Sequence, residues 1–63
     1  MFVNGKKLNT ESKTIHQLIV ELNLNSEKIV VEVNGSIVQK KDYYNSFIYS
    51  EDTIEIVSFV GGG

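Results

Sequence analysis

Sixty-three residues, 41% of them hydrophobic and 22% charged, are enough for one small folded domain and too few for two separate cores. All six basic residues are lysines scattered along a chain of net charge −2, which excludes the basic face that nucleic-acid binding needs. The absence of cysteine excludes a disulfide framework and a thiolate zinc site, so packing has to stabilise the domain.

The chain opens with a hairpin signal followed by a helix signal. Residues 1–3 and 6–9 flank the dipeptide Asn4-Gly5, which favours a tight turn between two strands. Thr14, with Gln17 three residues later, forms a capping box at the start of a helix. Apolar residues then repeat at helical spacing on one face: Ile15, Leu18, Ile19 and Leu22. We therefore expect a short hairpin and one amphipathic helix over residues 15–23.

The rest of the chain is typical of strands. Residues 29–33 are a β-branched run that stops at a second tight turn, Asn34-Gly35, and Ile37 and Val38 resume as a short return strand. Residues 40–44 form a polar bridge whose tyrosines can cover the edge of a core. Residues 53–60 alternate as a final strand, with isoleucines on one face.

This element order predicts an α+β roll. One helix covers one face of a mixed sheet of four to five strands, and the last strand returns beside the first. The domain spans residues 1–60, and the glycine tail 61–63 follows it. No apolar run is long enough to cross a membrane and residues 1–5 lack the stretch of a secretion signal, so we expect a cytoplasmic protein.

The tail Gly61-Gly62-Gly63 is the part of the chain that could take part in a chemical reaction. A domain this small has little volume for a catalytic pocket, so we expect no enzyme activity, no bound cofactor and no metal. Three glycines span roughly 10 Å without side chains and could enter a narrow channel of a partner protein. The carboxylate of Gly63 is ionised and is a poor electrophile, so its activation, for example by ATP, has to come from outside. A glycine tail also occurs as an inert chain end, and composition alone does not decide between the two.

The alternation of side chains between the two faces of the last strand suggests where a partner protein could bind. If Ile54 and Ile56 face the helix, Val57 and Phe59 form an apolar patch that leads through Val60 to the tail. If Phe59 instead faces the helix, it is the last residue of the core. Our hypothesis is that Val57, Phe59 and Val60 dock the activating enzyme.

Four parts of the C-terminal half form a recognisable pattern: residues 33–38, Tyr43, residues 52–57 and the ending Phe59-Val60-Gly61-Gly62-Gly63. In these parts the chain resembles the ThiS family of thiamine-biosynthesis sulfur carriers. It implies a ubiquitin-like β-grasp fold. It further implies that a ThiF-type enzyme adenylates Gly63 with ATP, that a sulfur donor protein supplies sulfur to form a thiocarboxylate, and that this group serves a ThiG-type thiazole synthase.

Other readings of the sequence stay open. A carrier like the small subunit of molybdopterin synthase and a ubiquitin-like modifier share the diglycine end, and a plain protein-binding module would have an inert tail. His16, the only histidine, has no second base beside it and is expected to be a solvated helix residue. Glu51 and Asp52 are expected to form a hydrogen-bonding turn before the last strand rather than an acid–base pair.

Overall fold

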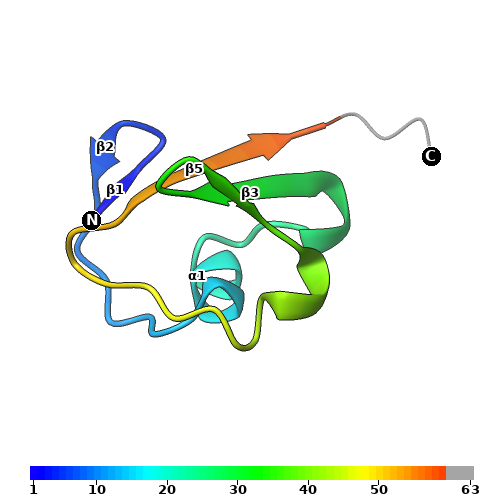
Figure 1. Ribbon diagram of the computed structural model, residues 1–63, viewed down its shortest axis with the longest axis horizontal. Helices are drawn as coiled ribbons and strands as arrows, with labels where there is room; N and C mark the ends of the chain where they lie inside the picture. The colour runs from blue at the N-terminus through cyan, green and yellow to red at the C-terminus, as the bar shows by residue number, and fades with distance from the viewer. Residues whose placement is uncertain (60–63) are drawn as a thin grey trace.

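The computed structural model describes residues 1–59 and places a single helix under a small sheet (Figure 1). The elements in chain order are β1 (Phe2–Val3), β2 (Lys6–Lys7), α1 (Ile15–Glu21), the 3₁₀ turn η1 (Ser26–Lys28), β3 (Ile29–Val33), β4 (Ser36–Val38), the 3₁₀ turn η2 (Lys40–Asp42) and β5 (Thr53–Ser58). The predicted hairpin, helix and later strands are all present, although the strands of the opening hairpin are shorter than expected.

The five strands form one mixed sheet in the order β2-β1-β5-β3-β4. The last strand, β5, pairs in parallel with β1 and antiparallel with β3, while β1–β2 and β3–β4 are antiparallel hairpins. Both hairpins turn at Asn-Gly, where Asn4, Gly5, Asn34 and Gly35 all have positive φ, the conformation of a two-residue turn that matches strand twist. The predicted return of the last strand beside the first is confirmed.

The core lies between α1 and one face of the sheet. Its buried residues come from the helix, the two long strands and the segment before β5: Ile15, Leu18, Ile19, Ile29, Val31, Tyr43, Ile48, Ile54 and Ile56. Residues at alternate positions of β3 and β5 supply four of these side chains, as expected for a sheet with one covered face. The opposite face of the sheet is not covered by any element of residues 1–59 (Figure 1).

The ends of α1 differ in two details from the prediction. Thr14 caps the helix by accepting the Gln17 N–H at 3.2 Å, but the Gln17 side chain accepts from the Lys13 N–H at 2.6 Å rather than from Thr14. The capping box is therefore half formed. The helix ends at Glu21 and not at residue 23, because Asn23 adopts the left-handed conformation (φ 58°) in which a helix cannot continue.

The bridge between β4 and β5 packs against the start of the helix. Carbonyls of Tyr43 and Ser46 accept the N–H groups of His16 and Ile15 at 3.0 and 2.9 Å, satisfying donors that the first helical turn leaves free. Tyr43 is buried and covers the edge of the core, and burial raises the pKa of its hydroxyl. The expectation that both tyrosines cover the core is wrong for Tyr44, which is 67% exposed.

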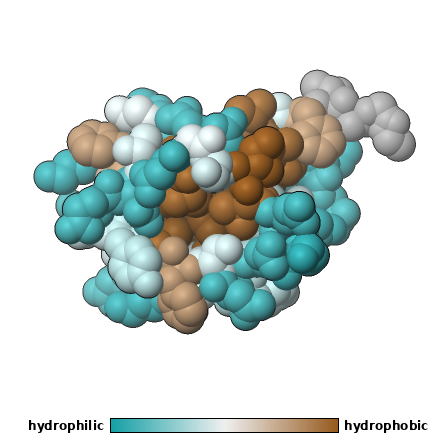
Figure 2. Space-filling model, in the orientation of Figure 1, coloured by the Kyte–Doolittle hydropathy of each residue, from teal (hydrophilic) through white to brown (hydrophobic). Residues whose placement is uncertain are grey.

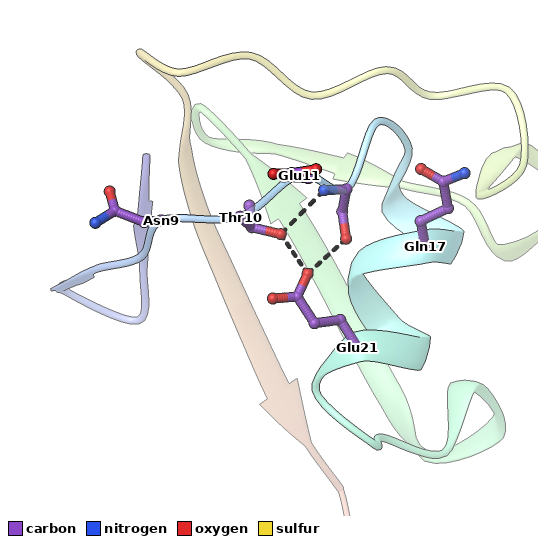
Figure 3. A pocket seen from close by; sticks show the side chains of 6 residues that line it. Asn9, Thr10, Glu11, Gln17 and Glu21 are labelled. Atoms are coloured by element: carbon purple, nitrogen blue, oxygen red, sulfur yellow. Dashed lines mark hydrogen bonds between the residues drawn. The ribbon is translucent and has the colours of Figure 1, made fainter.

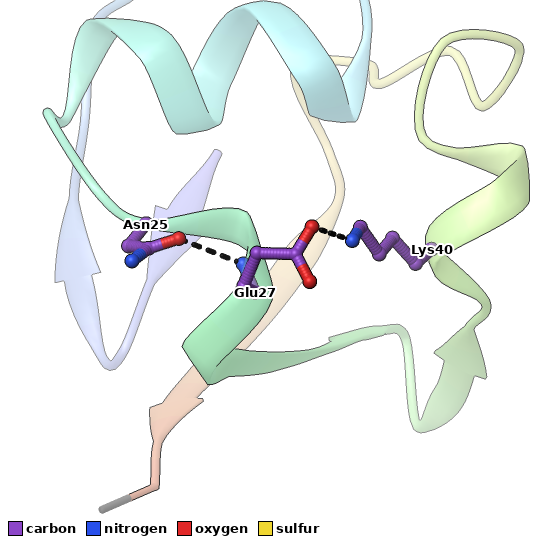
Figure 4. Close-up of polar contacts among 3 residues, drawn as sticks. All are labelled: Asn25, Glu27 and Lys40. Atoms are coloured by element: carbon purple, nitrogen blue, oxygen red, sulfur yellow. Dashed lines mark hydrogen bonds and ion pairs between the residues drawn. The ribbon is translucent and has the colours of Figure 1, made fainter. Parts of the chain in front are cut away.

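The two 3₁₀ turns are linked on the surface. The Glu27 carboxylate forms an ion pair with the Lys40 ammonium, and the Asn25 side chain caps η1 by accepting the Glu27 N–H at 2.9 Å (Figure 4). Both charged side chains are exposed, so the pair contributes little to stability. Its structural effect is to tie the segment before β3 to the segment after β4.

Candidate functional site

The site is built around β5, the strand that leads to the glycine tail. It is the middle strand of five, with β1 on one side and β3 on the other. Five residue pairs join it to β3 and two join it to β1. The predicted site residues Val60, Gly61, Gly62 and Gly63 lie outside the described residues. What the structure fixes is the strand that precedes them.

The faces of β5 are divided as the sequence alternation predicts. Ile54 is fully buried and Ile56 nearly so, both against the helix. Val57 is 57% exposed and Phe59 is 45% exposed. The prediction that Phe59 is exposed is therefore confirmed, and the alternative that it belongs to the core is wrong. An apolar surface therefore lies on the uncovered side of the sheet, directly before residue 60.

Two residues that the sequence analysis did not single out enlarge this surface. Val30 lies opposite Val57 across the β3–β5 pair, and Ile37 on β4 is exposed to 67%. We call the four exposed apolar side chains the outer patch: Val30, Ile37, Val57 and Phe59. In the view of Figure 2, hydrophobic residues gather over β3 and β4 and continue towards the end of the described chain.

A groove runs into the outer patch beside the end of β5. It has a volume of about 360 Å³, and its lining includes Val30, Ile37 and Phe59 of the outer patch. The ion pair of Glu27 and Lys40 and the buried side chains of Ile29 and Tyr43 also line it. The groove is mostly apolar with a charged rim, a composition that suits contact with another protein better than chemistry on a small molecule.

Two acidic side chains border the outer patch. Glu32 on β3 and Glu55 on β5 are directly paired in the antiparallel register. Like charges facing each other across a strand pair destabilise a sheet. The only ion pairs among residues 1–59 involve Glu27 and Asp42, so neither Glu32 nor Glu55 is neutralised within the described part of the chain.

Side chains of the two hairpin turns hold β5 from both sides. Asn4 donates from Nδ2 to the Ile56 carbonyl at 3.1 Å and accepts the Ile56 N–H at 2.7 Å. Asn34 accepts the Thr53 N–H at 2.9 Å and donates to the Asp52 carboxylate at 3.0 Å. Each asparagine thus bonds β5 in addition to making its own turn. These side-chain bonds hold β5 in addition to the backbone hydrogen bonds that pair it with β1 and β3.

A polar hollow on the other side of the molecule contains no catalytic arrangement. Within it, Glu21 on the helix accepts hydrogen bonds from the hydroxyls of Thr10 and Ser12, the latter at 2.6 Å (Figure 3). The Ser12 hydroxyl, and then that of Thr10, holds the pKa of the Glu21 carboxyl below its ordinary value. The three side chains tie the loop after β2 to α1, which is a structural function.

The remaining candidate residues have structural surroundings. His16 is half-buried and stacks on the Tyr44 ring with centroids 4.0 Å apart, so it is less solvated than predicted. Asp52 forms the predicted turn, accepting the Tyr49 N–H at 2.8 Å. Within residues 1–59 no cluster of His, Cys, Asp and Glu could hold a metal ion, and no helix is long and apolar enough to span a membrane.

Comparisons with known proteins agree on one family. The model of the ThiS family matches residues 3–63. The sulfur carrier protein ThiS of Bacillus subtilis (strain 168) is 38% identical over 63 residues, which cover 97% of this chain and 96% of that protein. The crystal structure of the thiamine biosynthesis protein ThiS from Geobacter metallireducens is similar with a TM-score of 0.84 at 26% identity, covering 98% of this chain and 96% of that one.

A longer protein contains a similar domain. A thiazole synthase of Paramagnetospirillum magneticum is 39% identical over 64 residues, which cover 100% of this chain and only 20% of that protein. The chain therefore spans a fifth of the length of this relative.

Proposed function

The chain belongs to the ThiS family and is a sulfur carrier of thiamine biosynthesis, and from this premise we propose that Gly63 carries the sulfur as a terminal thiocarboxylate. The fold agrees with the family, since a mixed sheet of five strands with one helix is the ubiquitin-like β-grasp arrangement expected from the resemblance. The observation that carries the proposal is the match of the family model through the glycine end, residues 3–63.

The proposed chemistry takes place on a partner enzyme. A ThiF-type enzyme joins the Gly63 carboxylate to AMP from ATP, releasing pyrophosphate, so that an unreactive carboxylate becomes a mixed anhydride. A sulfur nucleophile derived from a sulfur donor protein then attacks the carbonyl carbon and displaces AMP. The product is a thiocarboxylate, which passes its sulfur to thiazole synthase. Gly63 is a carrier group in this scheme, and Gly61 and Gly62 give it access to narrow active sites.

The structure supports this proposal through what precedes the tail. A glycine tail delivers its end accurately only if its base is held in place, and β5 is the middle strand of the sheet with additional bonds from Asn4 and Asn34. The outer patch lies beside the same end of β5, and its side chains are apolar and exposed. We assign to it the docking of the activating enzyme, with Val57 and Phe59 as contacts, and we extend the assignment to Val60, the next residue in the sequence, which lies outside the described residues.

Intact mass tests the carrier role. The purified protein is incubated with ATP, the ThiF-type enzyme and sulfide, and its mass should change by the exchange of one oxygen for sulfur. Removal of Gly63 should abolish that change. An unchanged mass of the intact chain, with an enzyme shown to be active on another carrier, would contradict the proposal and leave a binding module with an inert tail.

The docking role of the outer patch needs a separate test. Phe59→Ala should lower the rate of adenylation, measured by pyrophosphate release at limiting carrier, while leaving the unfolding midpoint nearly unchanged. Phe47→Ala is a matched control, because Phe47 is also an exposed phenylalanine but pairs with Thr14 near the start of the helix. Equal rates for the two variants would remove the outer patch from the docking surface.

A further inference from the structure

One edge of β5 lacks a partner strand just before the tail. The Phe59 N–H donates to the Lys28 carbonyl at 2.9 Å and the Asn34 N–H to the Thr53 carbonyl at 2.8 Å. Odd-numbered residues of β5 therefore direct their backbone groups at β3, and even-numbered ones direct theirs at β1, since these directions alternate along a strand. Ser58 is the last even-numbered residue of the strand.

The β1 side of β5 is occupied only over its first half. β1 pairs with Thr53 and Ile54, and the Asn4 side chain then bonds both backbone groups of Ile56 in place of a third strand residue. Beyond Asn4 the hairpin turns away into β2. Within residues 1–59, nothing is bonded to the Ser58 N–H and carbonyl, which point along the same side. An open strand edge of this kind is a template for another strand.

An apolar groove lies directly beside this open edge. It has a volume of about 400 Å³ and lies between the end of the β1–β2 hairpin, the end of the helix and the last residues of β5. Val3, Leu22, Leu24 and Ile56 supply its apolar lining, and Ser58 lies at its margin. Lys6 also lies at the margin, and it has no ion-pair partner among the described residues.

We propose that an extended segment of thiazole synthase adds to β5 at Ser58, in line with β1, and places an apolar side chain in this groove. Main-chain hydrogen bonds at the edge and a side-chain pocket beside it are the two parts of recognition by strand addition. The exposed ammonium of Lys6 favours a segment with a carboxylate next to its apolar residue. This inference rests on the proposed function, because it names the protein that receives the sulfur.

One relative carries a similar domain and a thiazole synthase in a single chain. A similar domain makes up 20% of the Paramagnetospirillum magneticum thiazole synthase, so in that protein the synthase portion is joined covalently to the domain. Linkage of this kind gives two surfaces a high effective concentration, and a weak strand-to-edge contact then suffices. The outer patch is on the opposite face of β5 from the groove, so it can serve the activating enzyme separately.

Hydrogen exchange of the Ser58 amide tests the proposal without any substitution. In the free protein this amide should exchange fast, whereas the Val57 amide, which points to β3, should be protected. Adding the purified cognate thiazole synthase to the unloaded carrier should protect Ser58 at least about fivefold, in line with one added hydrogen bond. A complex in which Ser58 exchanges as in the free protein would overturn the proposal.

Replacing Ser58 by proline, with alanine as the matched control, tests the same hydrogen bond by substitution. Ser58→Pro removes the N–H from the open edge without breaking the β3 ladder, because the Ser58–Ile29 pair is not hydrogen-bonded. It should weaken binding to thiazole synthase about fivefold or more, whereas Ser58→Ala should bind within about twofold of the natural protein. Lys6→Glu should also weaken binding. Equal affinity of Ser58→Pro and Ser58→Ala would overturn strand addition.

Sulfur loading separates this inference from the proposed function. Ser58→Pro should still gain the mass of one sulfur with ATP, the ThiF-type enzyme and sulfide. Loss of loading in parallel with loss of synthase binding would overturn the assignment of this edge to the synthase. A natural chain that fails to load contradicts the proposed function, while the exchange experiment on the unloaded complex still tests the edge.

Discussion

Glu32 and Glu55 lie directly opposite each other on the uncovered face of the sheet, next to the outer patch. Like charges directly opposite each other destabilise a strand pair, whereas a pair of opposite charges contributes about 0.2 to 1 kcal/mol relative to two alanines. The position of this pair beside the proposed docking surface suits a partner that brings a positive charge, which would relieve the repulsion on binding.

Reversing one of these charges should stabilise the free protein. Glu55→Lys replaces a repulsive cross-strand pair by an attractive one, and we expect the free energy of unfolding to rise by about 0.5 kcal/mol. Urea unfolding at low ionic strength measures this, and added salt should reduce the gain. Glu51→Lys makes the same change of charge on the turn before β5 and is the control. A gain of the same size at Glu51 would mean that net charge, and not the pair, is responsible.

The Asn4 side chain should be essential to the anchoring of β5. Asn4→Gly keeps a residue suited to φ 53° but loses both bonds to Ile56, and Asn4→Asp loses the donor and places a carboxylate against the Ile56 carbonyl. Each variant should lower the free energy of unfolding by about 1 to 2 kcal/mol, as the loss of two partly buried hydrogen bonds suggests. Asn9→Asp, on the exposed loop, is the control for the charge, and a similar loss there would refute the explanation.

The Glu21 carboxylate should make stability depend on acid pH. Hydrogen bonds from Ser12 and Thr10 lower its pKa in the folded state from the ordinary 4.5, so the unfolded chain binds the proton more tightly. The stabilisation is therefore complete above about pH 4.5 and is lost as the pH falls through the lower folded pKa. Thermal unfolding of Glu21→Gln should give a lower midpoint than the natural chain at pH 7 and a similar one near the acid end. Glu11→Gln, at the rim of the same hollow, is the control for the loss of a carboxylate, and an equal fall of its midpoint at pH 7 would contradict the explanation.

The two faces of β5 should respond differently to truncation. Ile54→Val removes one methylene from a fully buried position and should cost about 1 kcal/mol of unfolding free energy. Val57→Ala removes more atoms from an exposed position three residues later and should cost less than about 0.5 kcal/mol. Chemical unfolding of both variants under one set of conditions makes the comparison. If Val57→Ala proved the more costly change, the outer patch would have to be covered in the free protein.

The sequence predicts those parts of the fold that depend on neighbours along the chain. The Asn-Gly turns, the cap at Thr14 and the alternation of Ile54 and Ile56 with Val57 and Phe59 all follow from local rules, and each is present. These local rules also place the exposed half of the final strand correctly. They do not predict which residues face each other on neighbouring strands, because the pairing register depends on contacts between residues that are distant in the sequence.

The missed features are therefore those set by register and by long-range bonds. Val30 joins the outer patch only because it lies opposite Val57, and Ile37 because β4 pairs with β3. In the same way, nothing near Asn4 in the sequence indicates that its side chain bonds Ile56, 52 positions away. The proposed carrier chemistry at Gly63 is implied by the family resemblance and not by any local rule, and its test is biochemical.

The two Asn-Gly turns also set how the protein ages chemically. In an Asn-Gly pair the glycine nitrogen can attack the carbonyl carbon of the asparagine side-chain amide with little steric hindrance. Ammonia leaves, and water then opens the resulting cyclic imide to aspartate or isoaspartate. Here both susceptible amides are held in hydrogen bonds to the strand that leads to the tail. Folding thus restrains the side-chain amides whose loss would weaken the attachment of β5. We therefore expect Asn4 and Asn34 to deamidate more slowly in the folded chain than in the unfolded chain.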